Sequence, residues 1–191
     1  MRIVGGRLGG RRIAAPRGQS TRPTSERVRE GIASALEARG WIEGARVLDL
    51  FAGTGALSFE ALSRGAAQAV MVDSDPARVR AIEKAARELG LEREVRALAF
   101  DLERDPRALL ARLPEDSSFD LVFFDPPYAR VGAVTPLLAA LLESGKLTPG
   151  AAIVVEHARR APPTLPDDFA CVATYRYGDT AVILSEAPGE P

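Results

Sequence analysis

The chain has 191 residues, 46% of them hydrophobic, which suits one domain with a sizeable core and a short appendage. No run approaches the roughly 18 apolar residues of a membrane span and the N-terminus lacks a secretory signal, so we expect a cytoplasmic protein. The single cysteine, Cys171, excludes an internal disulfide, is expected in a buried strand, and with one histidine does not favour a zinc site.

The net charge of −1 conceals a strong asymmetry along the chain. Residues 1–30 contain eight arginines and two glutamates, a net charge of +6, whereas the remainder carries 17 basic and 24 acidic residues, a net charge of −7. A basic segment attached to an acidic body suits the binding of a polyanion. A solvated basic tail would have the same composition and stays an alternative.

The N-terminal segment is predicted to form an extension to the main domain. Residues 2–15 favour a basic hairpin, because Gly9-Gly10 separates two short apolar runs and can take the positive φ of a turn. A turn-rich link follows at residues 16–23. We therefore divide the chain into a basic extension, residues 1–24, and a main domain, residues 25–191.

Helical and strand patterns alternate through the main domain. Asp75 with Pro76, and Asp105 with Pro106, each combine a helix cap with a proline at the first helical position, while Gly178-Asp179 is typical of a hairpin turn. The pattern predicts an α/β fold with a mostly parallel sheet, helices on both faces and a C-terminal antiparallel pair. The expected strands are 47–51, 69–72, 95–100, 121–124, 152–155, 171–177 and 180–185, and the expected helices begin at a Thr24 or Ser25 cap, at 56, 76 and 106, and at about 131.

The segment Asp49–Gly55 (DLFAGTG) follows the first of these strands and is typical of a nucleoside cofactor loop. Gly53 and Gly55 let the loop turn sharply and bring its backbone against a ligand at a helix N-terminus. A dinucleotide loop would have its third glycine at the position of Ser58. The carboxylate of Asp49 would repel a pyrophosphate but suits the methionine ammonium of S-adenosylmethionine.

Two further strand ends carry acidic residues suited to the rest of this cofactor. Asp73 lies 20 residues beyond Gly53, where a carboxylate can accept both ribose hydroxyls, although a loop cap is the alternative. Asp101 is expected to accept from the adenine amine, with Leu102 against the ring. The predicted cofactor-binding residues are Asp49, Phe51, Gly53, Gly55, Asp73, Ser74, Asp101 and Leu102.

The segment Asp125–Tyr128 (DPPY) follows the fourth strand and is predicted to hold the group that receives the methyl. Asp125 and the Pro126 carbonyl can accept the N–H bonds of an amine, Pro127 stiffens the loop, and Tyr128 can stack on a flat base. A rigid turn is the alternative. Because ligands bind at the carboxyl ends of parallel strands, we expect both motifs to line one cleft and to transfer a methyl group to an amino nitrogen.

These motifs together resemble those of class I methyltransferases that act on exocyclic amines. Three further segments narrow the resemblance, at residues 2–13, 22–30 (RPTSERVRE) and 177–182 (YGDTAV). With them the chain resembles the RsmD family of bacterial 16S rRNA (guanine-966 N2)-methyltransferases over about residues 1–185.

The resemblance implies a class I, Rossmann-like fold with a seven-stranded sheet and an S-adenosylmethionine-dependent enzyme that leaves S-adenosylhomocysteine. The implied substrate is the N2 amine of one guanine of 16S rRNA, either naked or in a partly assembled small subunit, modified by a monomer during ribosome biogenesis. The basic N-terminus would hold the RNA. The predicted RNA-binding residues are Arg7, Arg11, Arg12, Arg22, Thr24, Arg27 and Arg29.

Several alternatives stay open. An adenine-N6 DNA methyltransferase also uses a DPPY loop, a related fold methylates protein amides, and a non-catalytic RNA-binding assembly factor could keep the same fold. His157, at the end of the fifth strand, is expected to be a solvated rim residue or an RNA contact rather than a catalytic base. Arg130 is interpreted equally as a phosphate contact or a plain surface residue.

Overall fold

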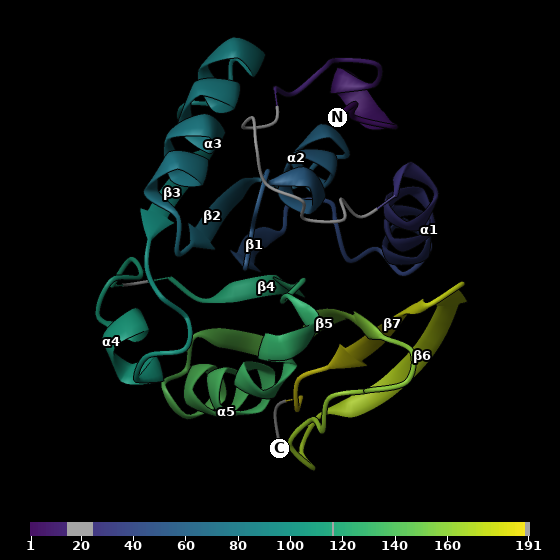
Figure 1. Cartoon of the computed structure of the whole chain (residues 1–191), viewed down its shortest axis with the longest axis vertical. Coiled ribbons are helices and arrows are strands. Elements are labelled where there is room, and N and C mark those ends of the chain that lie inside the picture. Colours follow the sequence, from purple (N-terminus) through teal and green to yellow (C-terminus); the bar gives the residue numbers. More distant parts are fainter. Residues whose placement is uncertain (15–24, 116, 190–191) are drawn as a thin grey trace.

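The computed structural model describes residues 1–14, 25–115 and 117–189, which are built around one sheet (Figure 1). The seven strands of these described residues lie in the order β3-β2-β1-β4-β5-β7-β6. Strands β1 to β5 run parallel, and β7 is antiparallel to both β5 and β6, as the sequence predicted. The strands are β1 Arg46–Leu50, β2 Gln68–Asp73, β3 Val95–Ala99, β4 Phe119–Phe124, β5 Leu147–Ala158, β6 Ala170–Tyr177 and β7 Thr180–Glu186.

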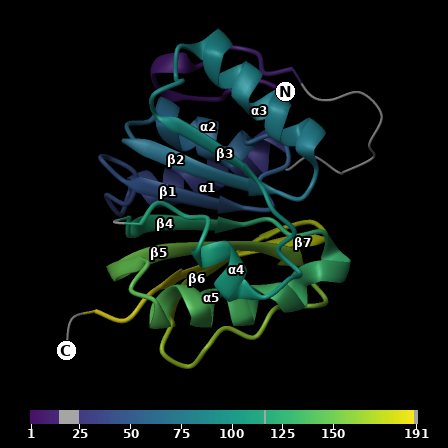
Figure 2. The same cartoon turned by 90° about the vertical axis from the view of Figure 1, so that its left-hand side faces the viewer.

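Helices cover both faces of the sheet (Figure 2). Helices α1, α2 and α3 pack on one face and α4 and α5 on the other. Successive side chains of β1 alternate between these faces, so that Val47 joins the first layer and Leu48 the second. No helix within the described ranges is long and apolar enough to cross a membrane. The helices are α1 Glu26–Glu37, α2 Ala56–Ser63, α3 Pro76–Leu89, α4 Pro106–Leu110 and α5 Val134–Glu143, with short 3-10 helices η1 Gly6–Leu8 and η2 Tyr128–Ala133.

Capping side chains mark the starts of α1, α3 and α4. Asp75 and Pro76 begin α3 as predicted. Ser25 caps α1, and its hydroxyl accepts the backbone N–H of Val28 at 3.2 Å. The alternative cap, Thr24, lies outside the described residues. The cap on α1 is useful for the site because it fixes where the arginine-bearing first turns of this helix lie.

The C-terminal third agrees with the predicted order of elements and differs at Cys171. Residues 159–169 contain no helix and lead from β5 directly into β6. Cys171, expected to be buried, is exposed because β6 is the last strand of the sheet and no described helix covers it. The hairpin between β6 and β7 is confirmed, with a φ of 63° at Gly178 in its turn.

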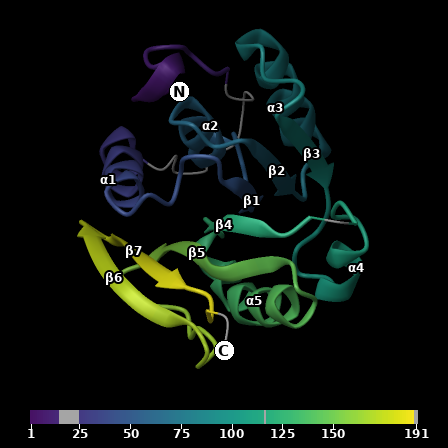
Figure 3. The ribbon, with the colours of Figure 1, turned by 180° about the vertical axis from the view of Figure 1, so that it is seen from behind.

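The N-terminal segment, residues 1–14, is not the regular hairpin that was expected. A single antiparallel bridge joins Arg2 and Arg12, and residues 4–9 between the two sides form a wide loop that contains η1. The two sides pair, since the backbone N–H groups of Ile3 and Ile13 donate to the carbonyls of Arg11 and Met1 at 3.0 and 2.9 Å. The connection is a wide loop rather than a two-residue turn at Gly9-Gly10, and the segment follows the surface of α2 (Figures 1 and 3).

Buried contacts dock this segment on the main domain. The buried carboxylate of Glu60 on α2 accepts the backbone N–H groups of Val4 and Gly5, both at 2.8 Å. The segment therefore belongs to the same packed unit as α2. Its three apolar side chains join the core on this face of the sheet: Ile3, Leu8 and Ile13.

Candidate active site

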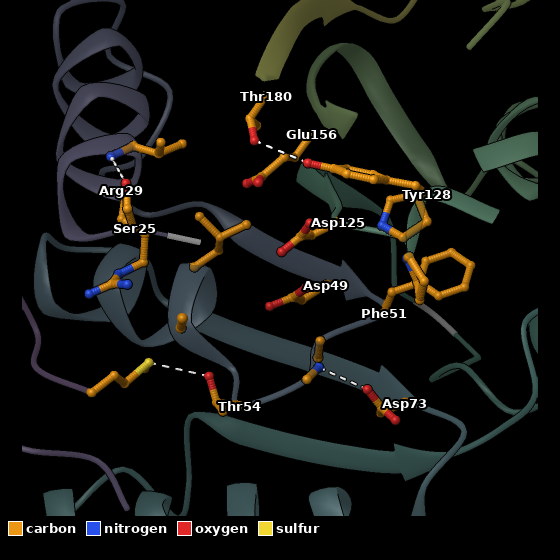
Figure 4. A pocket seen from close by; sticks show the side chains of 18 of the residues that line it. Ser25, Arg29, Asp49, Phe51, Thr54, Asp73, Asp125, Tyr128, Glu156 and Thr180 are labelled. Atoms are coloured by element: carbon orange, nitrogen blue, oxygen red, sulfur yellow. Dashed lines mark hydrogen bonds between the residues drawn. The ribbon is translucent and has the colours of Figure 1, made fainter. Parts of the chain in front are cut away.

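The carboxyl ends of the central strands open onto a cavity of about 600 Å³, within the range of small-ligand sites. The cavity lies where the strand order reverses, between β1 and β4, which is the usual ligand position in open α/β sheets. Figure 4 shows the carboxylates of Asp49, Asp125 and Glu156 directed toward this space. The predicted residues that line it are Asp49, Phe51, Gly53, Asp73, Ser74, Leu102, Asp125, Pro126, Pro127, Tyr128, Arg27 and Arg29.

The glycine loop adopts backbone conformations that few side chains tolerate. Phe51, directly after β1, has a φ of 67°, which costs a bulky residue about 1–3 kcal/mol and is found mainly at functional sites. A Cβ on Gly53 would meet only the Phe51 carbonyl oxygen, at 3.9 Å, so this side of the loop is open. A Cβ on Gly55 would lie 2.9 Å from both Met71 and Phe59. Gly55 therefore allows α2 to pack on the sheet, and it is not among the described residues lining the cavity.

Asp49 is buried on β1 at the wall of the cavity. The Ser58 hydroxyl of α2 donates to its carboxylate at 2.7 Å. Burial, with smaller contributions from the nearby carboxylates of Asp125 and Asp73, raises the pKa of Asp49 to about 7 against the opposing effect of the Ser58 bond. A cation in the cavity would favour the ionised form of Asp49. From the sequence, Ser58 was noted only because a dinucleotide-binding loop would have a glycine at this position. Its hydrogen bond to Asp49 could not be predicted, because it depends on how α2 packs against β1.

Asp73, at the end of β2, holds the glycine loop in place. Its carboxylate accepts the backbone N–H of Gly53 at 2.8 Å and that of Asp75 at 2.9 Å. Arg78 on α3, which sequence reasoning missed, forms an ion pair with it at 3.4 Å. A carboxylate offers about four acceptor positions, so these contacts leave room for one bond to a ribose hydroxyl.

The acceptor loop, Asp125–Tyr128, leaves β4 beside β5 and faces the cavity. The hydroxyl of Tyr128 lies 3.2 Å from the hydroxyl of Thr180 on β7 (Figure 4). Tyr128 is nevertheless 47% exposed, so its ring stands at the mouth of the cavity with one end held. An exposed ring fixed in this way offers a flat surface for a planar ligand.

Two residues lie elsewhere than the sequence indicated. Asp101 is exposed, its carboxylate accepts the Glu103 backbone N–H at 3.2 Å, and it is not among the described lining residues, although Leu102 is. His157, expected at a solvated rim, is buried. Alternate side chains of β5 point to opposite faces of the sheet, and only Glu156 of this pair lines the cavity.

The predicted RNA-binding residues are divided between the surface and the interior. Arg27 is exposed at the cavity, whereas Arg22 and Thr24 lie outside the described residues. Arg11 donates to the Glu88 carbonyl of α3 at 2.8 Å. The exposed arginines of the N-terminal segment, residues 1–14, are Arg2, Arg7, Arg11 and Arg12.

Arg29 differs from these because it is buried. It donates to the backbone carbonyl of Arg2 at 2.9 Å, which ties α1 to the N-terminal segment. Because Arg29 is buried in the wall of the cavity, it is not placed to bind an RNA phosphate at the surface of the protein. Arg130, left open by the sequence, forms an ion pair with Glu103 at 3.2 Å and also lines the cavity.

Sequence reasoning also missed residues that reach the cavity from distant segments. The Thr54 hydroxyl of the glycine loop donates to the Met1 sulfur at 3.2 Å, so the N-terminal residue is part of the wall. Glu156 and Thr180 line the opposite side. No local pattern marks these positions, since each depends on which strand ends adjoin in the sheet.

The fold and the cavity define the class: the chain has the Rossmann-like fold of class I methyltransferases. A family model described as "Conserved hypothetical protein 95" matches residues 1–186. Ribosomal RNA small subunit methyltransferase D of Escherichia coli (strain K12) is 34% identical over 195 residues, which cover 100% of this chain and 92% of that relative. The chain belongs to the RsmD family.

Solved structures agree with this assignment. The chain is similar to yhhF of Escherichia coli, with a TM-score of 0.82 and 31% identity over 100% of this chain and 99% of that one. An RNA methyltransferase from Salinibacter ruber in complex with S-adenosyl-L-homocysteine gives a TM-score of 0.62 at 22% identity, covering 88% of this chain and 95% of that one. The second likeness is one of fold alone.

Proposed function

We propose that the chain transfers a methyl group from S-adenosylmethionine to the exocyclic N2 amine of a guanine in 16S rRNA, guanine 966 in the numbering of the family name. The observation that carries the proposal is that the glycine loop, Asp49–Gly55, and the acceptor loop, Asp125–Tyr128, face one cavity. The name of the Escherichia coli relative supports small-subunit rRNA as the substrate.

The donor set of the cavity fits this cofactor. Asp49 suits the methionine ammonium, and its raised pKa reflects chiefly the burial of its carboxyl. Asp73 would accept a ribose hydroxyl, with Ser74 beside it, and Leu102 would contact the adenine. Asp101 keeps an adenine role only if its exposed loop approaches the cavity. When bound, S-adenosylmethionine supplies a methyl group already activated on a sulfonium.

The acceptor loop would orient the amine. The lone pair of a nucleobase amine is delocalised into the ring, so the amine is a poor nucleophile until its N–H bonds are held. Asp125 and the Pro126 carbonyl would accept those bonds and direct the lone pair into the cavity. Tyr128, held by Thr180 at 3.2 Å, would stack on the base. No strong base is needed in this arrangement.

The basic extension, residues 1–24, would bind the RNA. The main domain is acidic overall, so the exposed arginines must supply most of the attraction to phosphates. A guanine amine has to reach a deep cavity, which favours an unstacked or flipped base. Arg27 and Arg22 would lie nearer to the target nucleotide than the arginines of the N-terminal segment. We place the protein in the cytoplasm as a monomer that acts during ribosome biogenesis.

Mass mapping of 16S rRNA incubated with the protein and labelled S-adenosylmethionine tests the proposal. Asp125→Ala should lower the rate of methylation by about 10²–10³ and leave cofactor binding unchanged. Asp125→Asn should keep part of the activity, since its amide oxygen still accepts. Asp168→Ala, at an exposed position before β6, is the matched control. Normal methylation by the Asp125→Ala variant would exclude this acceptor site.

A further inference from the structure

A second carboxylate stands beside the one assigned to the acceptor amine. Glu156 lines the cavity on β5 and is only 8% exposed. The register pairs Phe124 with Val155, so Asp125 and Glu156 come at the same level of neighbouring strands, whose backbones lie about 4.8 Å apart. Both carboxylates are directed into the same space (Figure 4).

Arg29 on α1 is one of the charged groups around Glu156. Its guanidinium interacts electrostatically with Glu60, Glu26 and Glu156. Its guanidinium also donates to the Arg2 carbonyl at 2.9 Å. A carboxylate beside the amine site can accept one further N–H.

Guanine differs from the other amine-bearing bases in the group next to its amine. On its Watson–Crick edge the N2 amine adjoins N1–H, a donor, whereas the amines of adenine and cytosine adjoin ring nitrogens that accept. Enzymes that extrude a base recognise it by this edge. A site with two neighbouring acceptors matches two neighbouring donors, and guanine is the base that offers them.

We propose that Glu156 selects guanine by accepting its N1–H bond while Asp125 accepts the N2 amine, an assignment that rests on the proposed function. Adenine or cytosine would turn a ring-nitrogen lone pair toward the Glu156 carboxylate. Two acceptors would then face each other in a buried site, and neither would have a hydrogen-bond donor. The free-energy cost of these unpaired groups makes the site discriminate strongly against adenine and cytosine. Glu156 is thus a specificity-determining residue, and Asp125 holds the reacting amine.

One change in the RNA and one in the protein test this assignment. 2-Aminopurine keeps the N2 amine but has an accepting N1 and no O6, so 16S rRNA carrying it at the methylated position lacks both the N1–H donor and the O6 acceptor. We expect the wild-type protein to methylate this RNA with a kcat/KM roughly 10- to 100-fold below that for guanine. The amide of Glu156→Gln can donate to the N1 of 2-aminopurine. This variant should lower the kcat/KM for the guanine RNA and make it similar to the kcat/KM for the 2-aminopurine RNA. Glu83→Gln, on the exposed face of α3, should keep the wild-type ratio.

Two results would overturn the assignment. One is equal efficiency of the wild-type protein on the two RNAs, and the other is a Glu156→Gln variant that lowers both by the same factor. Equal efficiency of the wild-type protein overturns the assignment without any variant. Because 2-aminopurine also lacks O6, a lower efficiency supports the assignment only when Glu156→Gln, shown to be folded by its unchanged affinity for S-adenosylmethionine, removes the difference between the two RNAs. Failure of the wild-type protein to methylate any guanine N2 of unmodified 16S rRNA would instead refute the proposed function.

Discussion

Replacing Glu60 with alanine tests whether the N-terminal segment is a packed part of the domain or a basic tail. The Glu60 carboxylate is 2% exposed and accepts three bonds at 2.8 Å, from the backbone N–H groups of Val4 and Gly5 and from Arg64 Nε. Alanine would remove all three bonds. The two backbone groups would then face a cavity without an acceptor, and residues 1–14 would lose their polar anchor on α2.

The size of the effect follows from these bonds. Each hydrogen bond to a charged group contributes about 1.5–3 kcal/mol, so losing the two from the backbone should lower the free energy of unfolding by about 3–6 kcal/mol. For a chain of this size that corresponds to a decrease in Tm of roughly 6–24 °C. Glu37→Ala is the matched control, because Glu37 also pairs with Arg64, at 2.6 Å, but its side chain is 45% exposed. Exposed pairs contribute at most about 1 kcal/mol.

Urea unfolding gives the stability, and amide hydrogen exchange gives the protection of Val4 and Gly5. Glu60→Ala should lower stability and expose both amides, and RNA affinity should fall because the arginines of the segment are no longer held. The reasoning is refuted if Glu60→Ala is no less stable than Glu37→Ala and both amides keep their protection.

Three other predictions concern the cavity and the charged surface. Asp73→Ala should weaken S-adenosylmethionine binding in calorimetry and, by freeing the Gly53 N–H, lower stability by about 1–3 kcal/mol; unchanged affinity would remove Asp73 from the site. The pKa of Asp49 is raised to about 7 in the folded state, so the native protein binds more protons than the unfolded chain and stability falls as pH rises toward 7. Asparagine at this position does not titrate. The free energy of unfolding of Asp49→Asn, measured with urea, should therefore rise relative to that of wild type by about 1.4 kcal/mol for each pH unit between about pH 4 and 7. A difference in stability that does not change with pH would contradict this. Alanine at Arg7, Arg11 and Arg12 together should weaken RNA binding and flatten the slope of log affinity against log salt by ~0.7 per lost phosphate contact, whereas an unchanged slope would leave them as solvated residues.

Local sequence patterns determined the layers of the fold and the position of the two loops. Apolar runs of strand length, proline next to a capping aspartate and glycine beyond a helix end act through the backbone of a few neighbouring residues. Asp75 and Pro76 begin α3 for this reason, and Gly178 turns between β6 and β7. The parallel arrangement then brought Asp49 and Asp125 to the same edge of the sheet, as expected.

Only the tertiary structure decided which face of each element is covered and by what. A period of two predicts that Glu156 and His157 point to opposite sides, but the strand order decides that Glu156 faces the cavity. Cys171 is exposed because β6 is the edge strand. The N-terminal loop depends on Glu60, more than 50 residues away along the chain, and Asp101 remains outside the cavity through a bond within its own loop. These outcomes rest on contacts between distant segments, for which the spacing of residues along a single strand or helix carries no signal.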